Sequence, residues 1–285
     1  MLDVTNESSW TFGVVSIFRG GGASLTAALS PFLRALSETL NRCVTAHFAD
    51  DYRDLLRAVL SGETTLAWMP PLLHMHAARG GATLLALCER NGELSYRSAL
   101  LVHKDSPYQS LAELQGARFA FGDPHSAAGH VFPRQALRNA GVDPDIDRDR
   151  VAYLGSPEAC ARAVAERLFD VCACYIADAE SPEELDPERD IRLHLKDDAA
   201  SLRVLGITEP IPCDGIVAAP GIAEGVLIEL RNSLLVLNAS MRWKATLRRL
   251  FESTALRPAS ERVRRSLREW SDSGLLDEMR ESTAE

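Results

Sequence analysis

Residues 117–141 read ARFAFGDPHSAAGHVFPRQALRNAG. The mostly apolar segment 118–121 predicts a short strand, and the Gly-Asp-Pro-His cluster at 122–125 predicts a turn. Ser126 has the chemistry of a helix N-cap and is followed by small residues and a helical pattern, for which Gly141 is a good stop signal. The stretch therefore predicts a strand, a tight polar loop and a helix in direct succession, which is the repeating unit of α/β proteins.

The loop has the features of an anion-binding site. A strand that feeds a helix through a tight loop points several backbone N–H groups at one place, and that place lies at the positive end of the helix dipole. We therefore expect the segment Ser126, Ala127 and Ala128 to bind an anion, with His125 beside it as a donor or a general base. The alternative is an ordinary connection between a strand and a helix.

Hydrophobic patterning on both sides of this stretch alternates between strands and helices. The expected strands are 11–17, 43–48, 66–69, 83–88, 98–102, 118–121, 150–154, 170–175, 191–195 and 203–207. The expected helices are 25–41, 52–60, 126–139 and 157–167, and helical patterns fill most of 221–279. This alternation predicts mainly parallel sheets with helices on both faces.

The segment DPHSAAG at 123–129, followed by PR at 133–134, resembles a motif of the substrate-binding proteins of phosphonate ABC transporters, which reads Asp-Pro-Asn-Ser-Thr-Ser-Gly and then Pro-Arg. The lead-in SLAELQG at 110–116 is similar to their Ser-Leu-x-Asp-Leu-x-Gly. The resemblance implies the type 2 periplasmic-binding-protein fold. That fold has two α/β lobes, each a mainly parallel sheet flanked by helices, joined by a two-strand hinge.

The chain is long enough for two such lobes, since 285 residues can bury a large core. We expect lobe one to comprise residues 1–102 and 208–285, and lobe two to comprise residues 103–207. The chain would then cross between the lobes twice, near Val102 and near Ile207.

The resemblance also implies ligand contacts outside the helix. Tyr52 and Tyr96 match two ligand-contacting tyrosines of the family, and Trp68 resembles a residue that lines its cleft. Asp214, in Ile-Pro-Cys-Asp, matches the Asp that faces the amino end of amino-phosphonate ligands. Each aromatic has the alternative of being plain core, and Asp214 that of a turn residue bonded to its own backbone. From the residues themselves, Arg19 in the glycine-rich loop after the first strand is a candidate to clamp a carboxylate or phosphate.

The chain departs from the family at the anion site. The family's Ser-Thr-Ser becomes Ser126-Ala127-Ala128, and Gly155-Ser156 is followed by Pro157, where the family usually has His. A charge-assisted hydrogen bond is worth roughly 1.5–3 kcal/mol, so the loss of three side-chain donors lowers phosphonate affinity by several orders of magnitude. Unless Arg19 or His125 replaces them, a carboxylate or a larger, less charged molecule fits better than a phosphonate.

Charge and hydropathy argue against some binding partners and some cellular locations. The formal net charge of −9 argues against a nucleic-acid partner, and no run of about 20 apolar residues exists that predicts a membrane span. Residues 1–10 lack the basic and apolar regions of a secretory signal. We therefore expect a cytoplasmic location, and a periplasmic one only if a signal peptide has been removed.

Two functions remain open. The first is a solute-binding or sensor protein that closes two lobes around an anionic or zwitterionic small molecule, with a transporter or signalling partner. The second is a cytosolic enzyme on the same scaffold, acting on a small carboxylate or phosphorylated metabolite, with His125, Asp214, Glu89 and Tyr96 as acid–base candidates. No metal-binding or cofactor motif occurs, so neither a metal nor a cofactor is expected.

Overall fold

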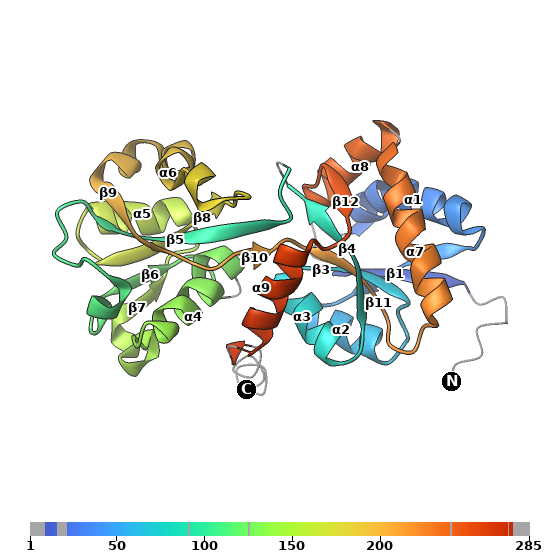
Figure 1. Cartoon of the computed structure of the whole chain (residues 1–285), viewed down its shortest axis with the longest axis horizontal. Helices are drawn as coiled ribbons and strands as arrows, with labels where there is room; N and C mark the ends of the chain where they lie inside the picture. The colour runs from blue at the N-terminus through green and yellow to red at the C-terminus, as the bar shows by residue number, and fades with distance from the viewer. Residues whose placement is uncertain are drawn as a thin grey trace. The chain divides into compact units, whose positions relative to one another are not determined.

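A computed structural model describes residues 9–15, 22–90, 92–124, 126–239, 241–272 and 274–275. The chain divides into two compact units: a first unit from residues 1–94 and 212–285, and a second unit from residues 95–211. The chain passes from one unit to the other twice, and the two passages lie side by side, because the amide of Cys213 donates to the carbonyl of Leu94 at 2.9 Å. Each unit carries its own sheet flanked by helices (Figure 1).

The first unit is built on a mixed six-stranded sheet in the order β12-β4-β11-β3-β1-β2. Its strands are β1 (Trp10–Val15), β2 (Val44–Ala49), β3 (Leu66–Met69), β4 (Thr83–Glu89), β11 (Gly215–Ala218) and β12 (Ala255–Arg257). Strands β1, β2 and β3 are parallel, as the βαβ pattern predicts, whereas the returning strand β11 is antiparallel to β3 and β4. Its helices are α1 (Gly22–Leu40), α2 (Tyr52–Leu60), α3 (Pro71–Arg79), α7 (Glu224–Val236), α8 (Met241–Phe251) and α9 (Glu261–Asp272), with a short 3-10 turn η8 (Leu237–Ala239).

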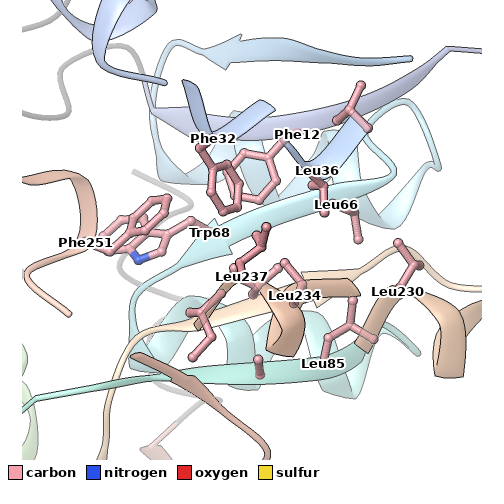
Figure 2. Packing of buried hydrophobic residues seen from close by; sticks show 14 of the residues in the cluster. Phe12, Phe32, Leu36, Leu66, Trp68, Leu85, Leu230, Leu234, Leu237 and Phe251 are labelled. Carbon is pink, nitrogen blue, oxygen red and sulfur yellow. The ribbon is translucent and has the colours of Figure 1, made fainter. Parts of the chain in front are cut away.

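Alternate residues of β3 face opposite sides of this sheet, as the period of two in a strand requires. Leu66 and Trp68 face the core under α1, α7 and α8, whereas Ala67 and Met69 face the core under α2 and α3. In the first of these cores the ring of Trp68 stacks on that of Phe251, with ring centres 5.9 Å apart (Figure 2). The sheet is thus buried on both faces at β3, which explains why this strand is apolar throughout.

The second unit has a sheet in the order β10-β5-β8-β6-β7, with β9 paired to β5. Its strands are β5 (Ser95–His103), β6 (Phe119–Phe121), β7 (Val151–Tyr153), β8 (Val171–Ala177), β9 (Leu202–Ile207) and β10 (Ile211–Pro212). Strand β6 is parallel to β7 and β8, and β5 is antiparallel to β8 and β9. The helices are a π-helical turn η3 (Ala127–Val131) that leads into α4 (Phe132–Asn139), then α5 (Pro157–Ala165) and α6 (Pro187–Leu195). Short 3-10 turns complete the unit: η2 (Leu111–Leu114), η4 (Pro144–Ile146), η5 (Arg148–Arg150), η6 (Pro182–Glu184) and η7 (Lys196–Ser201).

Two α/β units with helices on their sheets confirm the expected fold class. One expected strand was wrong, because residues 191–195 form the end of helix α6. The carboxylate of Asp186 caps this helix by accepting the amide of Arg189 at 2.9 Å, and Pro187 occupies its first turn. Ile191 and Leu195 are both buried, at the spacing of four that one helix face requires.

Two other elements differ from expectation. Strand β12 interrupts the helical pattern of residues 221–279, where the spacing of apolar residues predicts only helices. The expected boundary between residues 102 and 103 falls inside β5, all of which belongs to the second unit. Long antiparallel pairing of β5 with β8 explains the length of this strand, since seven residues of β5 are matched in register.

Candidate ligand-binding site

Helix η3–α4 of the second unit begins where the sequence predicts. Ser126 is its N-cap, and the Ser126 hydroxyl oxygen accepts the amide of Gly129 at 3.0 Å. Gly129 is suited to this contact, because a Cβ at this position would lie only 2.7 Å from the Ser126 oxygen. The amides of Ala127 and Ala128 have no acceptor among the described residues, so the helix start presents two backbone donors.

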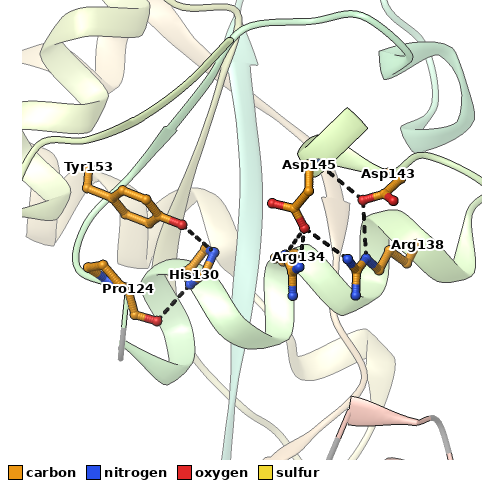
Figure 3. A network of polar contacts seen from close by, with 7 residues as sticks. All are labelled: Pro124, His130, Arg134, Arg138, Asp143, Asp145 and Tyr153. Carbon is orange, nitrogen blue, oxygen red and sulfur yellow. Dashed lines mark hydrogen bonds and ion pairs between the residues drawn. The ribbon is translucent and has the colours of Figure 1, made fainter. Parts of the chain in front are cut away.

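Hydrogen bonds from neighbouring side chains hold the loop before the helix in place (Figure 3). His130 is 8% exposed, and its Nδ1 lies 2.8 Å from the carbonyl oxygen of Pro124. Because a carbonyl only accepts, Nδ1 carries the proton and donates, and Nε2 accepts the hydroxyl of Tyr153 at 3.1 Å. Ser98 of β5 also donates its hydroxyl to the carbonyl of Ala128 at 2.6 Å. The segment on both sides of Ser126 is therefore anchored to neighbouring strands.

The arginine of the Pro-Arg motif that follows the helix start has a structural role. The guanidinium of Arg134 forms an ion pair with Asp145, and Arg138 donates to the same carboxylate at 2.9 Å and to Asp143 at 3.3 Å (Figure 3). These ion pairs connect helix α4 to turn η4. The charge of Arg134 is therefore paired within the second unit.

Tyr96 lies in β5, on the second unit, and is 6% exposed. Its ring packs against Tyr175 with centres 5.4 Å apart. Next to it, the buried carboxylate of Asp178 accepts the Ser95 hydroxyl at 2.5 Å and the Arg97 Nε at 2.7 Å. Burial raises the pKa of Asp178, but the hydrogen bonds from Ser95 and Arg97 outweigh it, so that the pKa lies below its ordinary value.

Tyr52 and Asp214 both lie in the first unit. Asp214 lies between β10 and β11 and is 5% exposed, and its carboxylate forms an ion pair with Arg90. Tyr52 is the first residue of α2 and is 41% exposed. Burial and, after it, the negative charge of Asp214 raise the pKa of Tyr52. Sequence reasoning missed Arg90, which follows β4 directly.

Trp68 and Glu89 belong to the same sheet and have structural partners. The Trp68 side chain is 5% exposed and stacks on Phe251 in the core. Glu89 accepts the Arg257 Nε and the Thr254 hydroxyl, each at 2.8 Å. Glu89 thus pairs with Arg257 and Thr254, whereas Asp214 pairs with Arg90. Arg19 and His125 lie outside the described residues.

Residues 18–263 match the family described as the periplasmic substrate-binding protein of phosphonate ABC transporters. The chain belongs to this family. It is 27% identical over 250 residues to the phosphonates-binding periplasmic protein of Escherichia coli K12, which covers 86% of this chain and 70% of that protein. A second curated relative is the phosphate-import protein PhnD of Mycolicibacterium smegmatis, which is 25% identical over 46% of this chain and 43% of that protein.

Solved structures of the same fold agree with the family match. The protein XAC2383 from Xanthomonas citri, in a structure bound to ATP, is 24% identical with a TM-score of 0.72, and the match covers 96% of this chain and 98% of that one. PhnD1 from Prochlorococcus marinus, in complex with methylphosphonate, is 20% identical with a TM-score of 0.59 over 94% of this chain and 98% of that one. The resemblance seen in residues 123–134 is therefore confirmed, and with it the periplasmic-binding-protein fold.

The family of phosphonate substrate-binding proteins implies a small-molecule ligand and a transporter partner for this chain. Within the part of the chain that the structure describes, no helix has the length and apolar character needed to cross a bilayer. The described residues also contain no cluster of three or more His, Cys, Asp or Glu side chains arranged to hold a metal ion.

Proposed function

We propose that this chain is the substrate-binding component of an ABC transporter and binds a small anion or zwitterion without chemical turnover. Its membership of the phosphonate-binding family supports this function. Among its structural neighbours, methylphosphonate and ATP are named as ligands, and both carry phosphorus-bound oxyanions. No contact among the described residues favours the enzyme alternative.

The observation that carries the proposal is the start of helix η3–α4. The Ser126 hydroxyl and the amides of Ala127 and Ala128 converge on the N-terminal end of a continuous helix that runs to Asn139. Fixed donors at the positive end of a helix dipole favour an oxyanion and need no rearrangement to bind it. His130 and Ser98 stabilise this geometry, because they form hydrogen bonds with the backbone on either side of Ser126.

The first unit supplies a second set of groups in this proposal. Tyr52 donates its hydroxyl to the ligand, and Asp214 with its partner Arg90 sets the charge that the ligand meets. Tyr96 of the second unit is a further aromatic contact. Trp68 supports this part of the first unit from its core. Arg19 and His125 are proposed as additional donors on the strength of the sequence.

A carboxylate is the stronger ligand class in this proposal, and a phosphonate the weaker. Two of the three family hydroxyl positions at the helix start are alanines in this chain, Ala127 and Ala128. Each missing charge-assisted hydrogen bond costs about 1.5–3 kcal/mol in binding. A dianionic phosphonate suffers more from this loss than a carboxylate, because it has more oxygen atoms to satisfy.

Calorimetric titration with methylphosphonate, inorganic phosphate, acetate and propanoate tests the proposal. We expect saturable binding of at least one anion, with no product detected by NMR after prolonged incubation. Replacing Ser126 by Ala should weaken that binding about tenfold or more, since a cap and a donor are lost together. The matched control is Ser156→Ala, because Ser156 caps α5 in the same unit and accepts the amide of Ala159 at 3.2 Å.

The control variant should lose a similar amount of stability and keep the wild-type affinity. Equal loss of affinity in both variants would assign Ser126 a purely structural role. Turnover of any tested anion, or no binding of any of the four, would contradict the proposed function.

Partner and compartment follow the same proposal in finer detail. We propose a transporter rather than a signalling protein as the partner, in keeping with the family description. The same description names the periplasm, whereas a cytoplasmic location was expected from the sequence. Fractionation of cells that express the native gene, followed by immunoblotting, decides between the two compartments. Closure of the two lobes around the ligand stays a prediction, which a decrease in radius of gyration on ligand addition would support.

A further inference from the structure

Asp214 is a buried carboxylate that already has a cationic partner. Its side chain is 8% exposed, that of Arg90 is 24% exposed, and the two form an ion pair. They come from segments 124 residues apart in the chain. Because the guanidinium of Arg90 neutralises this carboxylate, the Asp214 position carries no free negative charge toward a ligand.

The backbone fixes both members of this pair. The carbonyl oxygen of Asp214 accepts the amide of Cys88 at 2.8 Å, so Asp214 lies beside the end of β4. Arg90 follows Cys88 by two residues and therefore points to the same face of the strand. The amide and carbonyl of Arg90 also pair with those of Glu93 at 2.9 Å each, which closes a tight turn around Gly92. Neither side chain needs to move to reach the other.

The pKa of the Cys88 thiol is consistent with this placement of Asp214 and Arg90. Burial and then the charge of Asp214 raise the pKa of Cys88, while the charge of Arg90 opposes them. A single thiol is thus influenced by both charges. Burial and then the charge of Asp214 also raise the pKa of Tyr52.

We propose that Arg90 determines ligand class by rejecting anions that carry an ammonium group at the Asp214 end. This inference rests on the proposed function, in which Asp214 faces the ligand. An unpaired buried carboxylate attracts a cation, whereas one already bound to a guanidinium offers no net charge to it. An incoming ammonium must displace Arg90 or lie beside a like charge. The preferred ligand is therefore an anion whose other end is neutral or accepts hydrogen bonds.

Two matched pairs of compounds test this selectivity: ethylphosphonate with 2-aminoethylphosphonate, and propanoate with 3-aminopropanoate. The members of each pair differ by one ammonium group. Calorimetric titration of the wild-type protein should give tighter binding of the compound without the ammonium. In Arg90→Gln the carboxylate of Asp214 loses its partner, and the preference should reverse, with a change of about tenfold or more in the affinity ratio.

Two variants complete the cycle. Arg90→Gln combined with Asp214→Asn removes both charges, so we expect similar affinities for both members of a pair. Asp214→Asn by itself leaves Arg90 positive, and discrimination against the ammonium compounds should increase; this variant also serves if Arg90→Gln fails to fold. Arg57→Gln is the control, because Arg57 forms exposed ion pairs with Asp54 and Glu63 in the same unit, and its selectivity should equal that of the wild type.

The outcomes separate the two proposals. An unchanged affinity ratio in Arg90→Gln and in Asp214→Asn, with binding retained, would overturn the role of Arg90 and leave the binding function standing. A wild-type protein that prefers the ammonium compounds would also overturn it. If none of the four compounds binds to any variant, the proposed function itself fails, and the inference fails with it.

Discussion

His74 is a buried histidine on α3 whose ring contacts the peptide that precedes Asp214. Its Nε2 lies 3.1 Å from the carbonyl oxygen of Cys213, so this nitrogen carries the proton and donates. Burial lowers the pKa of His74 from 6.5 to about 4, although the hydrogen bond to Cys213 opposes the change. The neutral ring is therefore the form that the folded protein accommodates.

We predict that the protein loses stability as the pH falls from about 7 to about 4. Between the two pKa values the unfolded state binds a proton at His74 and the folded state does not. The free energy of unfolding therefore decreases as the pH is lowered. A pKa lowered from 6.5 to about 4 corresponds to a loss of about 3 kcal/mol in the free energy of unfolding by the time the pH reaches about 4. Urea denaturation at a series of pH values measures this slope.

The variant His74→Gln should flatten that pH dependence, because glutamine keeps a donor for Cys213 and does not titrate. The comparison variant is His47→Gln, which replaces a half-buried histidine on β2 of the same unit. If His74→Gln keeps the full slope between pH 7 and pH 4, other groups cause the acid sensitivity and the burial argument is wrong.

At the scale of elements, helix α8 packs into the core of the first unit with an aromatic side chain, Phe251, at its end. Phe251 is 1% exposed, and its ring centre lies 5.9 Å from that of Trp68 and 5.6 Å from that of Phe32 (Figure 2). Leu247 and Leu250 of the same helix are also buried in this core. The contacts join α8, β3 and α1, which are far apart in the chain.

Replacing Phe251 by Ala should lower the free energy of unfolding by about 3–5 kcal/mol, because a large cavity opens between three elements. Chemical denaturation followed by circular dichroism measures the loss. Val236→Ala is the matched control, since Val236 is 61% exposed at the end of α7 and its truncation should cost about 0.5 kcal/mol or less. A loss below about 1 kcal/mol in Phe251→Ala would mean that the core closes over the cavity.

At the scale of the whole molecule, the second unit is one continuous segment, whereas the first is assembled from two. Residues 95–211 contain a complete sheet and two apolar clusters of their own, one including Leu101 and Ile176 and the other including Leu100 and Phe119. Hydrogen bonds within this segment also join Asp178 to Ser95 and Arg97, and Arg97 to Thr208. These features are what an independently folding domain requires.

We therefore predict that residues 95–211 expressed by themselves fold into a cooperative unit. Thermal unfolding should show a single sigmoidal transition, and NMR should show dispersed amide signals. The comparison is residues 1–94 expressed without 212–285, which lack β11 and β12 and should not fold, because β11 lies between β3 and β4 in the sheet. A non-cooperative melt of residues 95–211 would show that this segment depends on the rest of the chain.

Local signals predicted much of the fold and part of the site. The N-cap at Ser126, the helix 52–60 and the strand 66–69 follow from neighbouring residues, because caps and periodicity act within a few residues. The strand predicted for residues 191–195 was wrong, because apolar and basic residues alternate there (IRLHL) as in a half-buried strand. Packing of Ile191 and Leu195 against β8 favours the helix instead.

The amino-acid order was sufficient to determine the family, the α/β alternation and the helix start at Ser126, because these depend on local chemistry. It was not sufficient to determine which charges meet. Asp214 pairs with Arg90 and Glu89 with Arg257 across separations of 124 and 168 residues. No local pattern encodes such pairs, since strand order and register bring their backbones together. The charge at the Asp214 position, and with it the ligand class that we propose, is therefore a property of the folded sheet.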